Sequence, residues 1–255
     1  MNTVTSFNLV DIGNNKIVVN KDCSVLSKSS IVFSGEGNVL IVEDGCRIEN
    51  STIRFNANNA IVFLKKNKFA IRLNLTINND CTFFLGNDCY FNGILNAVLS
   101  EQQNILIGDQ CLLSFGVWLR NSDAHLIYDV DTGCRVNKSE SIIIGDKVWI
   151  GQQASILKGS VIGSGSIIGF GSVVPHKNIG TNEAWGGNPA KLIRRNVFWD
   201  ATCVHLFTEQ QTSQKQCTSN REAVFKDDNK CSMFKAFNSL NKCDIDFKIK
   251  FLSQL

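Results

Sequence analysis

The sequence has no long hydrophobic run and no block of charge of one sign. No apolar stretch approaches the roughly 20 residues that a transmembrane helix needs, and the opening MNTVTSFNLV lacks the charged and apolar regions of a signal peptide. The formal net charge is only +3 and the basic residues are dispersed, so the chain has neither a nucleic-acid footprint nor a polybasic membrane patch. We expect a cytoplasmic protein with no membrane span and no nucleic-acid partner.

Histidine is scarce as well, since the chain contains only three, at positions 125, 176 and 205. The ten cysteines include no pair with the CxxC spacing that is typical of zinc sites, so we expect no metal site. Five of these cysteines end similar tetrapeptides, namely NKDC at Cys23, EDGC at Cys46, NNDC at Cys81, GNDC at Cys89 and GDQC at Cys111. A recurring slot indicates reduced thiols that pack as small hydrophobic groups in a repeat, rather than disulfides.

What the sequence does contain is a six-residue rhythm. Aliphatic side chains stand at every sixth position of one segment: Ile144, Ile150, Ile156, Ile162, Ile168 and Val174. A period of six fits three pleats of a strand followed by a corner, and it does not fit a helix. The rhythm predicts an all-β fold, a β-helix in which three short strands form one triangular coil of 18 residues.

The rhythm is looser upstream and is interrupted once. Motifs between Val19 and Ile107 recur every 21 to 23 residues, so we expect wider coils whose polar segments FNANN and LSEQQN bulge at a corner. After Leu119 the next hexad is due at residue 125, but the register returns only at Ile144, a surplus of 19 residues. This predicts a loop extruded near 121–140, and long loops on rigid scaffolds tend to carry function.

The rhythm ends after Val174, and the chain closes this part with PHKNIGTNEAWGGNPAKLIRR, for which we expect a turn and a short basic helical cap. We assign residues 1–198 to the β-helix and residues 199–255 to a short mixed C-terminal appendage. Within the appendage, Met233, Phe237 and Leu240 share a helical face, whereas Ile245, Phe247, Ile249 and Phe251 alternate as in a strand. About 55 residues form only a marginal core, so we expect a capping or partner-binding role.

The motif IGDKVWIG, the hexads through IIGFGSVV and the closing WGGNPAKLIRR resemble the hexapeptide-repeat acyltransferases. With RNSDAHLIYDVDTG, they are most similar to bacterial capsule and lipopolysaccharide O-acetyltransferases, including those that act on sialic acid. The resemblance is specific from about Asn104 to Asp200. It implies a left-handed β-helix, a homotrimer, acetyl-CoA as the donor in a groove between subunits, and a sugar hydroxyl as the acceptor.

The resemblance also implies catalytic roles for His125 as general base on the extruded loop and for Trp149 as a wall of the reaction centre. Histidine suits the role chemically, because its unperturbed pKa of about 6.5 leaves it largely free to accept a proton at neutral pH. Asp123 is placed to orient the ring, although a loop carboxylate is as often simply solvated. Trp149 stands at an outward position of its hexad, where a subunit contact is the other interpretation.

The remaining candidates are cofactor contacts. Gly151 and Gly169 leave room for an extended cofactor arm, although glycine is also the usual corner residue. Lys191 and Arg194 suit the CoA phosphates. The other interpretation is that they are only the basic last turn of a helix and bind no ligand. Lys177 follows His176 where relatives carry a threonine–lysine pair, and Trp185 belongs to the closing motif of the family.

Other functions remain open. Cys134 lies in the same loop and could act as a nucleophile, but direct transfer needs one group fewer. A zinc enzyme of the γ-carbonic-anhydrase type uses three histidines on the same fold, and three in the whole chain nearly exclude it. A non-catalytic scaffold would bind no CoA. An N-acetyltransferase of an amino sugar nucleotide would use the same base and groove, so the acceptor cannot be named from the sequence.

Overall fold

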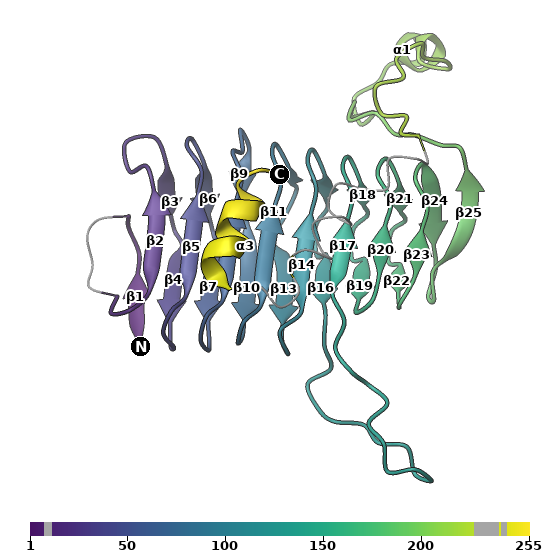
Figure 1. The fold of residues 1–255 in the computed structure, drawn as a ribbon. Coiled ribbons are helices and arrows are strands. Elements are labelled where there is room, and N and C mark those ends of the chain that lie inside the picture. The colour runs from purple at the N-terminus through teal and green to yellow at the C-terminus, as the bar shows by residue number, and fades with distance from the viewer. Residues whose placement is uncertain (8–11, 227–239, 241–243) are drawn as a thin grey trace.

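The computed structural model describes residues 1–7, 12–226, 240 and 244–255 and shows a parallel β-helix (Figure 1). Each coil contributes one strand to each side of a triangular prism, and successive coils pair in register. The pairs are parallel except at the two ends of the prism, where the first and the last pairs are antiparallel. The predicted all-β solenoid is therefore confirmed.

Three sides build the prism. Sheet A consists of β1 (Asn2–Val4), β4 (Ser30–Phe33), β7 (Thr52–Phe55), β10 (Leu73–Ile77), β13 (Leu95–Leu99), β16 (Trp118–Arg120), β19 (Ser155–Leu157) and β22 (Val173–Val174). Sheet B consists of β2 (Lys16–Val19), β5 (Val39–Val42), β8 (Ile61–Leu64), β11 (Thr82–Leu85), β14 (Asn104–Ile107), β17 (Ile142–Ile144), β20 (Val161–Ile162) and β23 (Asn178–Ile179).

The third side is divided into two sheets. Sheet C consists of β3 (Val25–Ser27), β6 (Arg47–Glu49) and β9 (Ala70–Ile71). Sheet D continues this side with β12 (Tyr90–Phe91), β15 (Leu112–Leu113), β18 (Trp149–Ile150), β21 (Ile167–Ile168), β24 (Glu183–Gly186) and β25 (Lys191–Arg195). Because the chain runs from sheet D to sheet A and then to sheet B, the corner between A and B lies opposite sheet D.

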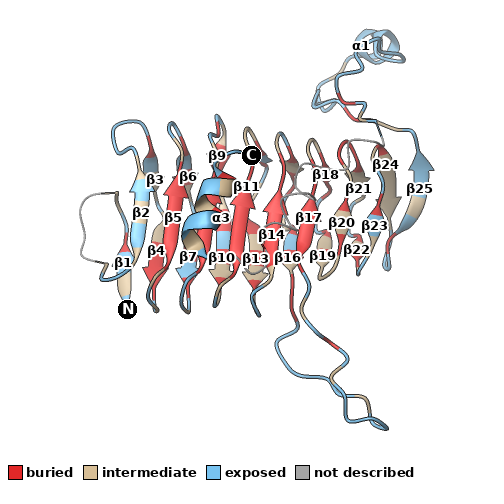
Figure 2. Cartoon of the chain, in the orientation of Figure 1, coloured by how far each residue is buried: buried red, intermediate tan, exposed pale blue. Residues whose placement is uncertain are grey.

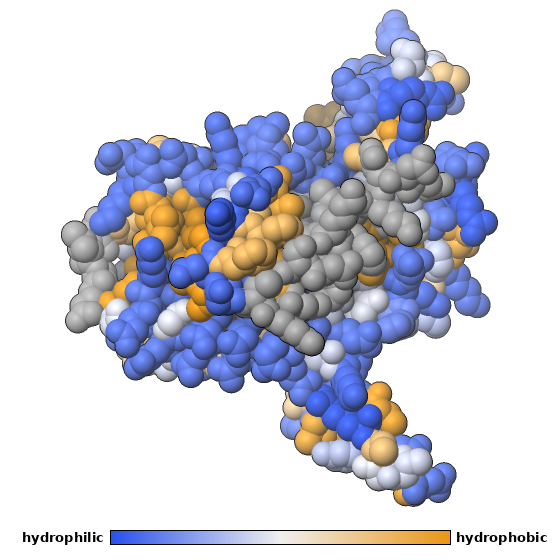
Figure 3. All heavy atoms as spheres, viewed as in Figure 1, coloured by the Kyte–Doolittle hydropathy of each residue, from blue (hydrophilic) through white to orange (hydrophobic). Residues whose placement is uncertain are grey.

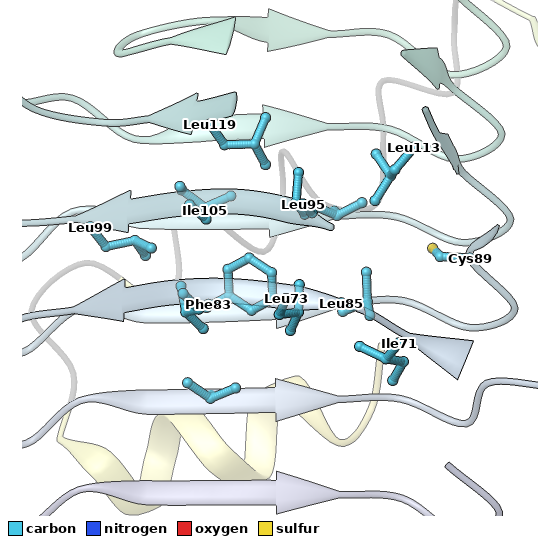
Figure 4. Close-up of a cluster of buried hydrophobic side chains, with 14 of the residues drawn as sticks. Ile71, Leu73, Phe83, Leu85, Cys89, Leu95, Leu99, Ile105, Leu113 and Leu119 are labelled. Atoms are coloured by element: carbon cyan, nitrogen blue, oxygen red, sulfur yellow. The ribbon is translucent and has the colours of Figure 1, made fainter. Parts of the chain in front are cut away.

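The hexad residues fill the interior of the prism. All six aliphatics of the regular segment, from Ile144 to Val174, are fully buried. Upstream the interior is built from larger side chains, which stack coil upon coil as Figure 4 shows for Leu73 with Leu95 and for Phe83 with Ile105. Such columns bury apolar surface against the neighbouring coil, so each coil stabilises the next.

The wider coils differ from the regular ones mainly at one corner. Leu95 pairs with Leu73, 22 positions earlier, whereas Ile167 pairs with Trp149, 18 positions earlier. The additional residues lie between sheets A and B, at 56–60 and at 100–103, which confirms the bulges expected at FNANN and LSEQQN. The extruded loop, 121–141, leaves the prism at this same corner between β16 and β17 (Figure 1).

The cysteine slot is mostly a core position. Cys46, Cys81, Cys89 and Cys111 are free and fully buried, and burial raises the pKa of Cys46 and Cys81 to about 11, so these thiols stay protonated and inert. Cys23 is the exception, because it is exposed. It precedes β3, the edge strand of sheet C, where no earlier coil covers the corner.

The described end of the appendage lies on sheet B. Helix α3 (Ile245–Leu252) lies across the middle strands of this sheet (Figure 1), whose residues are buried on both faces (Figure 2). The alternating apolar residues of this segment, which also fit a strand, left its structure open, and the segment forms a helix. Asp244 caps the helix by accepting a hydrogen bond from the Phe247 N–H. Alternation also supplies i, i+4 pairs, and Ile245 and Ile249 use this spacing to pack on sheet B.

Other parts of the appendage are described only partly. Leu240 is fully buried with this cluster, whereas Met233 and Phe237 lie outside the described residues. Helix α1 (Glu209–Gln214) projects from the end of the prism and has no buried residue (Figure 2). Among the described helices, none is both long and apolar enough to cross a membrane.

Candidate active site

The extruded loop is anchored at its base by a charged clamp. Arg135 donates two hydrogen bonds to the Glu101 carboxylate, at 2.7 and 2.8 Å, and the Ser139 hydroxyl donates a third. These bonds lower the pKa of Glu101 to about 2, with Arg135 as the largest cause. Glu101 belongs to the corner bulge of the preceding coil, so a polar segment of the prism holds the loop in place.

His125 stands on the outgoing arm of this loop. The amide nitrogen of the buried Asn137 side chain donates to the His125 carbonyl at 2.7 Å and to the Asp123 carboxylate at 3.0 Å. The His125 side chain is exposed, and within the described residues its ring makes no hydrogen bond. The loop therefore fixes the backbone of His125 and leaves both ring nitrogens available to a ligand.

Asp123 has partners other than the histidine ring. Lys158 donates to its carboxylate at 2.5 Å, and this bond is the largest cause of the lowered pKa of Asp123. Lys158 also donates to the Asn137 carbonyl at 3.2 Å. Asp123 thus ties the outgoing arm of the loop to the next coil, and its action on the His125 ring stays a prediction.

Trp149 lies on β18 with its side chain on the outer face of sheet D, where 38% of the residue is exposed. Its indole N–H donates to the Ser114 hydroxyl at 3.2 Å. Its ring packs against that of Trp199, with centroids 6.1 Å apart. Trp199 is itself nearly buried and donates to the Lys147 carbonyl at 2.7 Å, so it holds one side of the Trp149 ring in place.

Two further candidates, Gly151 and Gly169, occupy the corner that follows sheet D. A Cβ at Gly151 would lie 2.8 Å from the Ile168 carbonyl oxygen and 2.8 Å from the Phe170 nitrogen, so coil stacking alone requires glycine there. A Cβ at Gly169 would meet its nearest atom at 3.4 Å, an ordinary contact. Gly169 is therefore the position where packing between coils does not explain the glycine.

The closing segment is a strand and not the expected helical cap. β25 pairs antiparallel with β24, and Trp185 lies opposite Leu192. The turn that joins them contains Gly187 at φ +100°, a left-handed conformation that favours glycine, and the chain reverses there instead of continuing as a helix. Lys191 and Arg194 are exposed. A register shift between them places Lys191 opposite Gly186 and Arg194 opposite Ala184, so the two side chains lie on the same face of the strand pair.

The other members of this segment are tied to each other. Glu183 accepts hydrogen bonds from the Trp185 indole at 2.8 Å and from the Arg195 guanidinium at 3.1 Å. Lys191 and Arg194, by contrast, form no ion pair with any described residue. Lys177 lies elsewhere, at the corner between sheets A and B, half-buried beside His176, which approaches Glu140 at 3.3 Å.

The candidates therefore form two groups on opposite sides of the prism. His125, Asp123 and Lys177 lie at the corner between sheets A and B. Trp149, Gly151, Gly169, Trp185, Lys191 and Arg194 lie on sheet D or at its edges. Sequence reasoning missed the partner of Trp149, because Trp199 lies beyond the last hexad, where no repeat pattern predicts its position.

Comparisons with known proteins agree on the family. The profile described as "Bacterial transferase hexapeptide (six repeats)" matches residues 141–176. A polysialic acid O-acetyltransferase of Neisseria meningitidis is 33% identical over 183 residues, which cover 71% of this chain and 84% of that protein. A polysialic acid O-acetyltransferase of Escherichia coli O1:K1 / APEC is 43% identical over 122 residues, 48% of this chain and 38% of the relative.

A solved structure extends the likeness to most of the fold. The crystal structure of the polySia specific acetyltransferase NeuO superimposes with a TM-score of 0.63 at 29% identity, over 79% of this chain and 97% of that one. The segment that the family profile matches, residues 141–176, is also the segment with regular hexads and regular coils. The chain belongs to the hexapeptide-repeat acetyltransferases, in the group that contains the polysialic acid O-acetyltransferases.

Proposed function

We propose that the chain transfers an acetyl group from acetyl-CoA to a hydroxyl of sialic acid in a bacterial surface glycan, with His125 as the general base. The observation that carries this proposal is the 33% identity to a polysialic acid O-acetyltransferase over 84% of that relative's length. The anchored loop with its exposed histidine ring supports it, since a general base must reach the acceptor without a competing partner.

In this proposal the His125 ring takes the proton of the acceptor hydroxyl while the oxygen attacks the thioester carbonyl. A carbon–oxygen bond forms, and the charge moves to the carbonyl oxygen, which a backbone N–H near Trp149 receives. The intermediate then collapses, the carbon–sulfur bond breaks, and the imidazolium returns the proton to the thiolate. No covalent enzyme intermediate is required, so Cys134 has no part in the reaction.

The donor site in this proposal lies on the outer face of sheet D. Trp149, held by Ser114 and Trp199, forms a flat apolar wall for the pantetheine arm, and Gly169 leaves space beside it. The exposed cations of β25 supply charge for the phosphates, because ammonium and guanidinium groups are the usual partners of phosphate. Trp185 closes this end of the prism.

We further propose a homotrimer, because the loop that carries the proposed base leaves the prism on the side opposite the proposed donor site. The loop leaves from the corner opposite sheet D, and Figure 1 shows it projecting away from the prism. A closed ring in which each corner faces sheet D of the next subunit would bring His125 of one chain to Trp149 of another. Sheet B takes no part in such a contact where α3 covers it.

The decisive experiment is acetyl-CoA turnover against a panel of sialylated glycans, neutral glycans and amino sugar nucleotides, with mass spectrometry to locate the acetyl group. We expect transfer to hydroxyls of sialic acid only. Transfer only to an amine would replace the proposal with an N-acetyltransferase. If acetyl-CoA neither binds nor turns over, measured as an unchanged melting temperature, the chain is a scaffold instead.

A further inference from the structure

A small pocket lies at the foot of the extruded loop. Its volume is about 130 Å³, and it is lined by Arg120, Ser122, Asp123, Leu157, Lys158, Pro175 and His176. These residues come from three successive coils at the corner between sheets A and B. Leu157 and Pro175 form apolar walls, which strengthen electrostatic interactions at the pocket.

Most of the charge around this pocket is already paired. Lys158 is bound to Asp123 at 2.5 Å, and His176 approaches Glu140 at 3.3 Å. Arg120 differs from both. Its Nε donates to the Ser122 carbonyl at 3.0 Å, and in the described part of the chain no acceptor lies within hydrogen-bond distance of its two terminal nitrogens.

The position of Arg120 holds the free edge of its guanidinium group in a fixed orientation. The residue is the last of β16 and is half-buried, so its backbone is fixed by sheet A and its side chain by the bond to Ser122. A planar guanidinium with two free terminal nitrogens matches a carboxylate, which it binds through two parallel hydrogen bonds. The pocket thus presents one oriented guanidinium whose terminal nitrogens make no hydrogen bond to the described residues, although its charge also helps to lower the pKa of Asp123.

The pocket is coupled to the proposed base. Asp123 lines it, and the Asn137 amide joins the Asp123 carboxylate to the His125 carbonyl. A group bound at Arg120 therefore lies at the foot of the arm that carries the base. A volume of about 130 Å³ is well below the 300–1,000 Å³ of pockets that enclose a whole ligand, so the pocket suits a substituent of a sugar rather than an entire ring.

We propose that this pocket binds a carboxylate of the acceptor and that Arg120 is the residue that selects acidic sugars. The inference rests on the proposed function, because it assigns the acceptor side of the same site. Charge-assisted hydrogen bonds contribute about 1.5–3 kcal/mol, which corresponds to roughly ten- to hundredfold in affinity. The carboxylate should therefore account for a preference of this size.

The test compares Arg120→Gln with wild type on two probes, oligosialic acid and the same oligomer with its carboxyl groups reduced to alcohols. Binding is measured by calorimetry and acetyl transfer by mass spectrometry. Wild type should bind the acidic oligomer roughly ten- to hundredfold more tightly than the reduced one. Arg120→Gln should lose that preference and bind the reduced oligomer as wild type does, with an unchanged KM for acetyl-CoA.

Arg54→Gln is the matched control. Arg54 lies in the same column of the outer face of sheet A, in register with Arg120 through Thr76 and Val98, three coils away. This variant should keep the preference. The inference is overturned if Arg120→Gln still prefers the acidic oligomer, if it weakens both oligomers equally, or if wild type shows no preference. Failure of the proposed function would look different, because wild type would then acetylate neither oligomer. The binding preference would still be measured by calorimetry, independently of acetyl transfer.

Discussion

At the scale of single residues, His125 is the group whose removal should separate chemistry from structure. Its side chain is exposed, and Asn137 holds only its carbonyl, so His125→Ala should leave the melting temperature and acetyl-CoA binding nearly unchanged. Acetyl transfer should fall by about 10²–10⁴-fold, which is the usual effect of a positioned general base. Steady-state rates with the preferred acceptor, measured beside a thermal melt, check both halves of this prediction.

His205→Ala is the matched control for this change, because His205 is also exposed and lies beyond the β-helix, away from the loop. It should keep most of the wild-type rate. Should His125→Ala retain more than about a tenth of wild-type turnover, where a general base predicts far less, then the loop is a substrate lid and the base must be sought elsewhere.

At the scale of elements, the loop depends on the Glu101–Arg135 clamp. Because the pKa of Glu101 is lowered from 4.5 to about 2, its carboxylate stabilises the anchored loop fully above pH 4.5, and this contribution is lost as the pH falls from 4.5 through 2. We therefore expect the loop to stay anchored across the neutral range. Hydrogen exchange of the loop amides should accelerate only in that acidic window, after correction for the intrinsic pH dependence of exchange.

Glu101→Gln removes the charge that Arg135 needs, so its loop should exchange faster at neutral pH and show little further change in acid. Glu36→Gln, in the first coil, should behave like wild type. Equal protection of the loop in wild type and Glu101→Gln at neutral pH would contradict the clamp. It would also assign the anchoring of the loop to the Asn137 and Lys158 contacts.

The strand β25 carries two exposed cations on one face. Its register shift places Lys191 opposite Gly186 and Arg194 opposite Ala184, so both side chains can face the donor. We predict that Lys191→Gln and Arg194→Gln each weaken acetyl-CoA binding by roughly ten- to hundredfold, and that the double variant binds more weakly than either single variant. Calorimetric titration with acetyl-CoA measures this, with Arg195→Gln as a control because Arg195 is paired with Glu183.

If neither single variant changes the affinity for acetyl-CoA, the phosphates lie away from β25. Lys177 is then the next cation to test, as the one that follows the last hexad. Its place at the corner between sheets A and B would put it in the donor site of a neighbouring subunit rather than its own.

The elements that sequence reasoning predicted correctly are those fixed by repetition. The aliphatic side chain of every hexad from Ile144 to Val174 lies inside the prism, as predicted. The interruption before Ile144 locates the loop to within a residue or two. Segments outside the repeat are set by tertiary contacts instead. α3 is a helix because sheet B offers it an apolar face, and β25 is a strand because the edge of β24 is free to pair.

The same distinction applies to the site. His125 and Trp149 could be named because each stands out from the repeat, one as a lone histidine in the interruption and the other as an outward aromatic. The free edge of Arg120 and the contact between Trp199 and Trp149 could not be predicted, because both depend on which neighbours the fold brings near. No sequence spacing encodes those distances.

At the scale of the whole molecule, apolar surface indicates which faces remain for assembly. The middle strands of sheet B are covered by α3, but the loop exposes a run of large apolar side chains at Leu126, Ile127 and Tyr128 and again at Val130 and Val136. Figure 3 shows apolar residues gathered on the projecting loop. An exposed apolar cluster of this kind is typical of a surface that contacts another molecule, which agrees with the proposal that the loop reaches the next subunit.

The proposed trimer can be tested by mixing two inactive variants. His125→Ala lacks the base and Trp149→Ala lacks the donor wall, so each homotrimer should be nearly inactive. If the base of one subunit serves the donor site of its neighbour, co-expression in equal amounts should restore about a quarter of the sites in a closed ring. A site is intact only when the subunit that supplies the loop is the Trp149→Ala variant, which keeps His125, and the subunit that supplies the donor wall is the His125→Ala variant, which keeps Trp149. Each condition is met about half of the time. Separately purified variants mixed without subunit exchange provide the baseline. The co-expressed mixture could instead stay as inactive as this baseline while sedimentation shows trimers. Each chain would then complete its own site, and the proposal of a shared site would be wrong.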